Sequence, residues 1–257
     1  MLIVNRQHHE LLIAYYRNEL SKLPEGYFST YHNKKAVYIF RDPQDPKTTR
    51  SNKRRILLSS KEGQIYSKLV ERSTIIKAKL DYLNSLWKMT YWQEPRDIQF
   101  PLKKRYNSIL NKERFFNSSE MQNPILSNRP TLDYKDRKLR SKNELILCTE
   151  LDNLGYEYKV EINLSPNEFT ELFPDATFYV PEIEKPVSVE IDGAVDKESY
   201  LNKSENRKFN YLNNGFVEFK DIVFLRLTDA TQFDAQRLSD LIAASIFCNM
   251  SDIIMPD

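Results

Sequence analysis

The sequence predicts a mixed α/β fold: a sheet flanked by helices, preceded by a basic, mainly helical region that contains a β-hairpin. The carboxyl-terminal half alternates helical and strand patterns in the order α-β-β-β-α-β-α. The amino-terminal half contains one long helical pattern and a short hairpin pattern. Charge divides the chain at the same place, so we expect two domains, at residues 1–138 and 139–257.

The net charge of +2 conceals two oppositely charged halves. Residues 1–140 carry 28 Lys and Arg against 14 Asp and Glu, whereas residues 141–257 carry 10 against 22. A basic half of this kind favours binding to a polyanion such as nucleic acid. The alternative is that the two halves neutralise each other across an interface.

Composition narrows the class of protein further. A hydrophobic content of 40% is sufficient for a packed core, and no apolar run reaches the length of a membrane span. Cys148 and Cys248 have no metal-ligand spacing and lie in apolar helical patterns, which is typical of buried thiols in a reducing compartment. We therefore expect a cytoplasmic protein without a membrane partner.

The first predicted elements are a helix and a hairpin. Helical spacing runs from about Gln7 to Leu23, and it predicts that the adjacent His8 and His9 diverge on the helix, cannot share a metal and lie on the surface. The hairpin is expected at Tyr27–Tyr31 and Ala36–Arg41.

Two basic segments are candidates for contact with a phosphate backbone. The first is a mobile loop from Asp42 to Arg55, and the second lies in an irregular linker over residues 95–140. A solvated loop without a ligand is the alternative. The candidate residues are Lys47, Arg50, Lys53, Arg54, Arg55, Lys103, Lys104 and Arg105.

The longest helical pattern lies between these segments. Ser59 and Glu62 have the spacing of a capping box, and an apolar stripe continues to about Met89. Trp87 and Trp92 are predicted to be core residues, with base-stacking platforms as the alternative.

The carboxyl-terminal half begins with a helix from Ser141 to Gly155. Later elements follow the spacing of strands and amphipathic helices. They are strands at 156–164, 174–180, 187–193 and 222–227, and helices at 198–214 and 231–248.

Acidic residues stand at the ends of two neighbouring strands. Glu190 and Asp192 are two apart and project from one face, and antiparallel pairing would bring Asp175 beside them. Three converging carboxylates repel one another unless a cation lies between them. The pattern therefore predicts a Mg²⁺ site, with Mn²⁺ as a substitute, for phosphodiester chemistry.

Each acid also has an ordinary structural interpretation. Glu144 follows Ser141 at capping-box spacing, so it completes a helix amino terminus or belongs to the site. Asp175 after Pro174 is also typical of a turn, and a strand-end acid is often simply solvated.

These residues resemble the PD-(D/E)XK restriction-endonuclease-like nucleases. The resemblance covers about residues 139–248 and rests on Glu144, Pro174-Asp175 and Glu190-x-Asp192. Arg207, eight residues before Gly215, makes the chain most similar to the branch of very-short-patch-repair-type endonucleases. The resemblance implies metal-dependent DNA cleavage to 5′-phosphate and 3′-hydroxyl ends, with Asp175 and Glu190 as ligands and Asp192 and Glu144 in support.

The chain departs from that pattern in two places. The final motif position, usually Lys, is Asp192, and the branch often has a His where this chain has residues 194–196. Another cation must then stabilise charge on the phosphate, or the enzyme is inactive. Motif spacing favours Arg207, whereas helical periodicity with Leu201 and Leu212 favours Lys208.

The function expected from the sequence is therefore metal-dependent endonucleolytic hydrolysis of DNA, with RNA not excluded as substrate. The alternatives are an inactive nuclease fold that binds nucleic acid and a protein–protein interaction module. Homodimerisation or a partner protein stays open.

Overall fold

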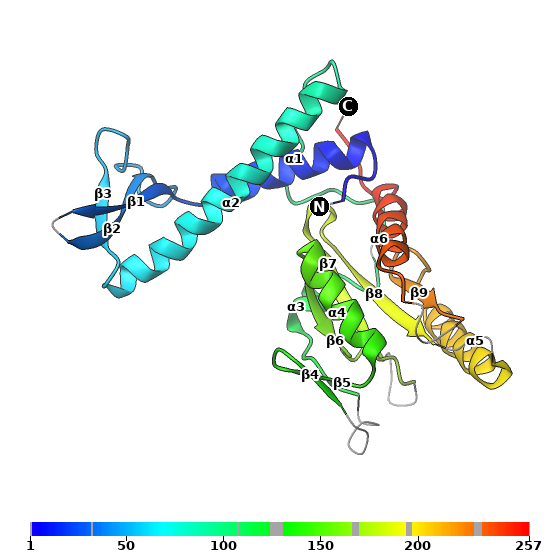
Figure 1. The fold of residues 1–257 in the computed structure, drawn as a ribbon. Helices are drawn as coiled ribbons and strands as arrows, with labels where there is room; N and C mark the ends of the chain where they lie inside the picture. The colour runs from blue at the N-terminus through cyan, green and yellow to red at the C-terminus, as the bar shows by residue number, and fades with distance from the viewer. Residues whose placement is uncertain are drawn as a thin grey trace. The chain divides into compact units, whose positions relative to one another are not determined.

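The computed structural model describes residues 2–31, 33–106, 108–123, 131–165, 170–193, 197–228 and 233–256 (Figure 1). The chain divides into a larger unit, Met1–His8 with Pro101–Met255, and a smaller unit, His9–Phe100. The predicted boundary at 138/139 falls inside the larger unit, because the segment after Pro101 packs there. Leu110 joins its core, and Lys159 Nζ donates to the carbonyl oxygens of Phe115 and Phe116 at 2.8 and 2.9 Å.

The smaller unit contains a three-stranded antiparallel sheet and two helices. The predicted hairpin is confirmed, but a third strand follows it where the sequence predicted a loop through Arg55. The elements are α1 (Arg6–Ser21), which begins in the larger unit, then β1 (Glu25–Tyr31), β2 (Lys34–Arg41), β3 (Arg54–Leu57) and α2 (Lys61–Thr90).

The long helix α2 covers one face of this sheet. Its amino-terminal cap is Ser60, whose side chain accepts from Gly63 N, so the predicted cap at Ser59 is wrong by one residue. Trp87 is 2% exposed, as predicted. The same prediction for Trp92 is wrong, since it follows the last helical residue and is fully exposed.

The prediction that His8 and His9 lie on the surface is wrong. Both are buried, and each ring finds a buried partner. His8 Nε2 lies 3.0 Å from Glu182 Oε1, whereas His9 Nε2 lies 3.0 Å from the carbonyl oxygen of Leu83. These partners offset the cost of burying an imidazole.

The larger unit contains a four-stranded mixed sheet in the order β6-β7-β8-β9. The first two pairs are antiparallel, and β8 and β9 are parallel through the crossover helix α5 (Glu198–Asn213). The predicted mixed sheet flanked by helices is therefore confirmed. Its strands are β6 (Glu157–Val160), β7 (Ala176–Val180), β8 (Lys185–Asp192) and β9 (Ile222–Arg226).

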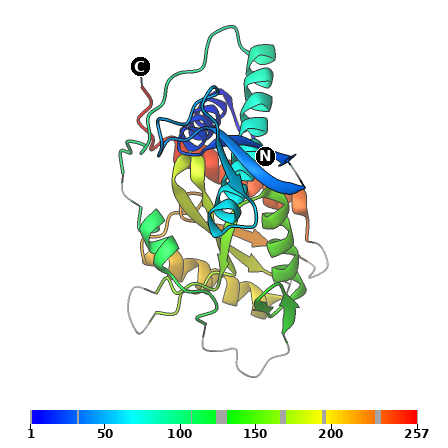
Figure 2. The same cartoon turned by 90° about the vertical axis from the view of Figure 1, so that its left-hand side faces the viewer.

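Helices lie on both faces of this sheet (Figure 2). Tyr179 of β7 stacks on Phe115 of α3, whereas its neighbour Phe178 points the other way and contacts Tyr156 after α4. The remaining elements are α3 (Lys112–Asn117), β4 (Leu132–Tyr134), β5 (Arg137–Leu139), α4 (Lys142–Leu154), the 3₁₀ helix η2 (Pro181–Ile183), α5 (Glu198–Asn213) and α6 (Ala235–Met250). The predicted start of the last helix at Thr231 lies outside the described residues.

The prediction that both cysteines are buried thiols is confirmed in part. Cys148 is buried, Cys248 is half-buried, and neither forms a disulfide. Within the described residues, no helix has the length and apolar character needed to cross a membrane.

Candidate active site

The paired strands β7 and β8 bring two predicted acidic residues together. Ala176 pairs with Val189, which places the preceding Asp175 beside Glu190. Asp175 Oδ2 accepts a hydrogen bond from Ile191 N at 2.6 Å. The antiparallel pairing expected from the sequence is confirmed, and it fixes Asp175 against the end of β8.

Glu190 and Asp192 project from the same face of β8 and share one cation. Arg207 Nη1 lies 2.6 Å from Glu190 Oε1 and 3.2 Å from Asp192 Oδ1. The two acids are 3% and 5% exposed, whereas the Arg207 side chain is 45% exposed. Arg207 therefore contacts two buried carboxylates while part of its own side chain is exposed to solvent.

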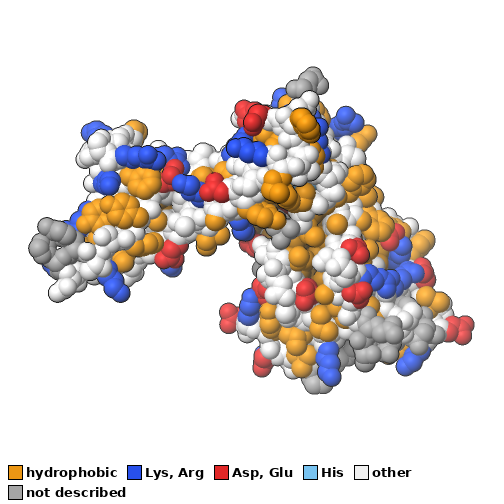
Figure 3. All heavy atoms as spheres, turned by 45° about the horizontal axis from the view of Figure 1, so that its top comes forward, with side chains coloured by type: hydrophobic (Ala, Val, Ile, Leu, Met, Phe, Trp, Pro, Cys, Tyr) orange, Lys and Arg blue, Asp and Glu red, His pale blue; other side chains and the backbone are white. Residues whose placement is uncertain are grey.

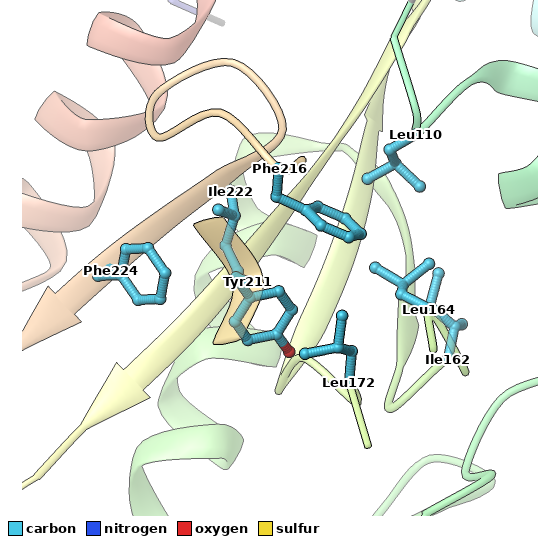
Figure 4. Close-up of a cluster of buried hydrophobic side chains, with 8 residues drawn as sticks. All are labelled: Leu110, Ile162, Leu164, Leu172, Tyr211, Phe216, Ile222 and Phe224. Atoms are coloured by element: carbon cyan, nitrogen blue, oxygen red, sulfur yellow. The ribbon is translucent and has the colours of Figure 1, made fainter. Parts of the chain in front are cut away.

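Three side chains on one face of α5 contact these acids. Ser204, Arg207 and Tyr211 are spaced three and four residues apart, so they lie on one side of the helix. Ser204 Oγ donates to Asp192 Oδ2 at 2.6 Å, and Tyr211 Oη donates to Glu190 Oε2 at 3.3 Å. The Tyr211 ring itself belongs to a buried hydrophobic cluster with Phe216 and Phe224 (Figure 4).

Lys208 does not meet the acids. Its Nζ lies 2.7 Å from Glu218 Oε2 and 5.3 Å from the centre of the Phe224 ring. Leu201 and Leu212, which define its predicted stripe, are each 39% exposed. Helical periodicity therefore selected the wrong face, and motif spacing selected the residue that contacts the carboxylates.

A polar cavity of about 230 Å³ opens beside the acids. Asp175, Glu190 and Arg207 line it, whereas Glu144, Asp192 and Lys208 do not. The other lining residues are Asn123, Arg140, Glu161, Glu171, Phe173 and Tyr211.

Glu144 completes the amino-terminal cap of α4. Ser141 Oγ accepts from Glu144 N at 3.1 Å, and Glu144 Oε2 accepts from Arg140 N at 2.8 Å. The capping interpretation is confirmed. Glu144 also acts on the site through its charge, which helps to raise the pKa of Asp175.

The sequence did not single out Glu161 and Arg140, which form an ion pair in the cavity wall. Glu161 is 3% exposed, and its Oε2 has no hydrogen-bond partner among the described residues. Burial raises the pKa of Glu161 to about 7, and the Arg140 guanidinium opposes that shift. Glu161 directly follows the last residue of β6, and no motif or periodicity marks it.

Negative charge in the cavity is incompletely compensated. Burial, together with the nearby Glu190 and Glu144, raises the pKa of Asp175 well above its usual range. Burial also raises the pKa of Glu190 to about 7, although Arg207 acts in the opposite direction. If Glu161, Asp175 and Glu190 were all ionised, three negative charges would face the two guanidinium groups of Arg140 and Arg207.

The donor chemistry of the cavity fits a hard cation. Asp175, Glu190 and Glu161 offer carboxylate oxygens, which Mg²⁺ and Mn²⁺ prefer, and one Glu161 oxygen is unpartnered in the part of the chain described. Asp192, also expected as a ligand, does not line the cavity, and its carboxylate accepts from Ser204 and Arg207. Among the described residues, no group of three or more His, Cys, Asp and Glu is arranged as a ready metal site.

The predicted nucleic-acid contacts divide into two groups. Arg54 is engaged with Glu62 and Tyr66, and Lys104 Nζ donates to the carbonyl oxygen of Glu184 at 2.8 Å. Burial lowers the pKa of Lys104. The exposed group comprises Lys47, Arg50, Lys53, Arg55, Lys103 and Arg105.

Comparisons with known proteins add no relative. A scan against protein-family models finds no match, and searches of curated proteins and of solved structures find no significant match. The fold and site described above therefore carry the functional argument.

Proposed function

We propose that the chain is a metal-dependent endonuclease that hydrolyses phosphodiester bonds in DNA, with a restriction-endonuclease-like larger unit. The cavity at the end of β8 carries this proposal. It combines Asp175, Glu190 and Glu161, whose Oε2 has no hydrogen-bond partner among the described residues, with two guanidinium groups in one solvent-connected site. Such a set suits a divalent cation together with a phosphate.

The topology supports the proposal. The order of α4, three antiparallel strands, α5 and a strand parallel to β8 agrees with the order that the helical and strand patterns of the sequence predict. Asp175 precedes the second strand and Glu190 lies near the end of the third, at adjacent ends of a pair. Fold alone does not specify an activity, so the argument depends on the side chains.

Asp175 and Glu190 would hold Mg²⁺, with Mn²⁺ as a substitute and Glu161 as an additional oxygen donor. When bound, the cation supplies Lewis-acid stabilisation of charge on the scissile phosphate. Tyr211 orients Glu190, and Ser204 orients Asp192. Arg207 balances both acids, and its exposed part provides positive charge at the cavity, the role that the absent motif Lys would have.

A second candidate is a protein that keeps this fold and binds nucleic acid without cleaving it. The observation that favours it is the acid at position 192, where the resembled family has Lys. Arg207 already contacts both strand-end carboxylates, so a cation entering the cavity would compete with it.

Plasmid cleavage separates the two candidates. We expect the purified chain to nick or linearise supercoiled plasmid with Mg²⁺ or Mn²⁺ and not with EDTA. Glu190→Gln and Asp175→Asn should each reduce the rate by at least about a hundredfold. Glu218→Gln is a matched control outside the cavity and should leave the rate unchanged. Salt-sensitive DNA binding without metal-dependent turnover would establish the second candidate.

A further inference from the structure

The sheet of the smaller unit has one face that α2 leaves uncovered. Val37, Ile39 and Ile56 pack with Val70 on the covered face. Side chains alternate along a strand, so Tyr38 projects from the opposite face. Its register partners Tyr27 on β1 and Arg55 on β3 project with it, forming a Tyr27–Tyr38–Arg55 row across the sheet.

The two tyrosine rings stack on each other. Their centroids are 5.3 Å apart and their planes differ by 8°. Tyr27 is 41% exposed and Tyr38 is half-buried, so the pair reaches solvent. Another planar group can extend this stack on a ring face that the other tyrosine does not cover.

One cation lies over Tyr27, and a second lies over Phe40 on the same strand as Tyr38. Lys53 Nζ lies 5.2 Å from the centre of the Tyr27 ring and 3.4 Å from Tyr27 Oη. The guanidinium of Arg50 lies 5.9 Å from the centre of the Phe40 ring. An apolar docking patch for a protein would not need this alternation of rings and positive charges.

The same segment carries an excess of positive charge. Residues 25–57 contain eight Lys and Arg and three Asp and Glu. All three carboxylates have partners inside the unit: Glu25 pairs with Arg41, Asp42 accepts from Tyr66 Oη, and Asp45 accepts from Thr48 Oγ1. In Figure 3, hydrophobic and Lys or Arg side chains gather together over β1, β2 and β3.

We propose that this aromatic face binds single-stranded nucleic acid. Unpaired bases would stack on Tyr27 and Tyr38, and Arg50, Lys53 and Arg55 would neutralise the neighbouring phosphates. A duplex hides its base faces, so a stacking surface selects unpaired strands, whatever their sequence. This inference rests on the proposed function for the class of partner, and it specifies which form of nucleic acid the smaller unit holds.

Fluorescence anisotropy of the full chain in EDTA tests the proposal without cleavage. The probes are a labelled oligo-dT single strand and a labelled duplex of the same length. We expect the single strand to bind at least about tenfold more tightly than the duplex. Tyr27→Ala should weaken single-strand binding about five- to tenfold or more, because stacking on one ring is lost, and Tyr27→Phe should restore it.

Tyr82→Ala is the matched control, since Tyr82 is 59% exposed on α2 of the same unit. Its binding should equal that of the unmodified chain. Lys53→Ala, on an exposed segment, should lower the slope of log affinity against log salt by about one, whether or not Tyr27→Ala folds. Equal binding by Tyr27→Ala, or duplex binding as tight as single-strand binding, would overturn the proposal.

The two proposals fail separately. If Glu190→Gln binds the single strand normally while cleavage is absent from every variant and from the unmodified chain, the nuclease proposal alone fails. If metal-dependent cleavage is present but Tyr27→Ala binds normally, the stacking proposal alone fails.

Discussion

Arg207 Nη1 lies 2.6 Å from Glu190 Oε1, so a guanidinium from α5 meets the carboxylate near the end of β8. The same nitrogen lies 3.2 Å from Asp192 Oδ1. The cation that contacts both acids therefore comes from the helix that follows β8 in the sequence.

Arg207→Gln should remove the positive charge that compensates Glu190 and Asp192. We expect the free energy of unfolding to fall by about 1–3 kcal/mol, less than for a fully buried pair because the Arg207 side chain is 45% exposed. Cleavage should fall by at least about a hundredfold. Urea unfolding and plasmid assays measure the two effects.

Lys208→Gln is the matched control for Arg207. Its partner Glu218 is a partly exposed acid, so we expect a change within about 1 kcal/mol and unaltered cleavage. A larger effect from Lys208→Gln than from Arg207→Gln would show that the helix presents the other face to the site.

The acidic cavity predicts a pH-dependent response to metal. The folded-state pKa of Glu190 is about 7 against an ordinary value of 4.5, so the folded state binds more protons between these values. Its contribution to stability therefore decreases as pH rises through this window. A divalent cation competes with that proton, so Mg²⁺ should raise the melting temperature more at about pH 8 than at about pH 6.

Thermal unfolding across pH, with and without Mg²⁺, measures this response. Glu190→Gln should remove most of the metal-induced shift at about pH 8. A shift of equal size at both pH values, retained in Glu190→Gln, would place the metal elsewhere.

Tyr211 joins the hydrophobic cluster to the acidic site, and two substitutions separate its roles. Tyr211→Phe keeps the ring and loses the donor to Glu190, so we expect a loss of about 1–3 kcal/mol or less in stability and a clear reduction in cleavage. Tyr211→Ala should cost about 3–5 kcal/mol, because it also opens a cavity beside Phe216 and Phe224. Equal destabilisation by both substitutions would contradict this division.

Substitution of Trp87 and of Trp92 tests which of the two tryptophans is packed in the smaller unit. Trp87 is buried and its Nε1 donates to the carbonyl oxygen of Gln93 at 2.6 Å, so Trp87→Ala should cost about 3–5 kcal/mol. Trp92→Ala should change stability by about 0.5 kcal/mol or less. Urea denaturation of both variants checks this, and similar costs would mean that Trp92 is covered.

The sequence predicted those features that local rules determine. The strand pair carrying Asp175 and Glu190 followed from β-type residues bounded by Pro and Gly, and the cap of α4 followed from the spacing of Ser141 and Glu144. Antiparallel pairing of these two strands was then sufficient to predict that Asp175 lies beside Glu190.

Tertiary contacts decided the rest. Glu161 joins the cavity through packing with Arg140, which no local pattern encodes. Helical periodicity through Leu201 and Leu212 predicted the wrong buried face of α5, because both leucines are exposed. The buried positions of this helix are the polar Ser204 and the aromatic Tyr211. His8 and His9 are buried because partners distant in sequence satisfy their ring nitrogens.

The most direct measurement of the central claim is a crystal structure of the chain soaked in Mn²⁺, with anomalous scattering used to locate the metal. We predict an anomalous peak in the cavity within coordination distance of Asp175 and Glu190 oxygens, with Arg207 still beside the acids. No peak in the cavity at saturating Mn²⁺, or a peak bound only by residues outside it, would contradict the account.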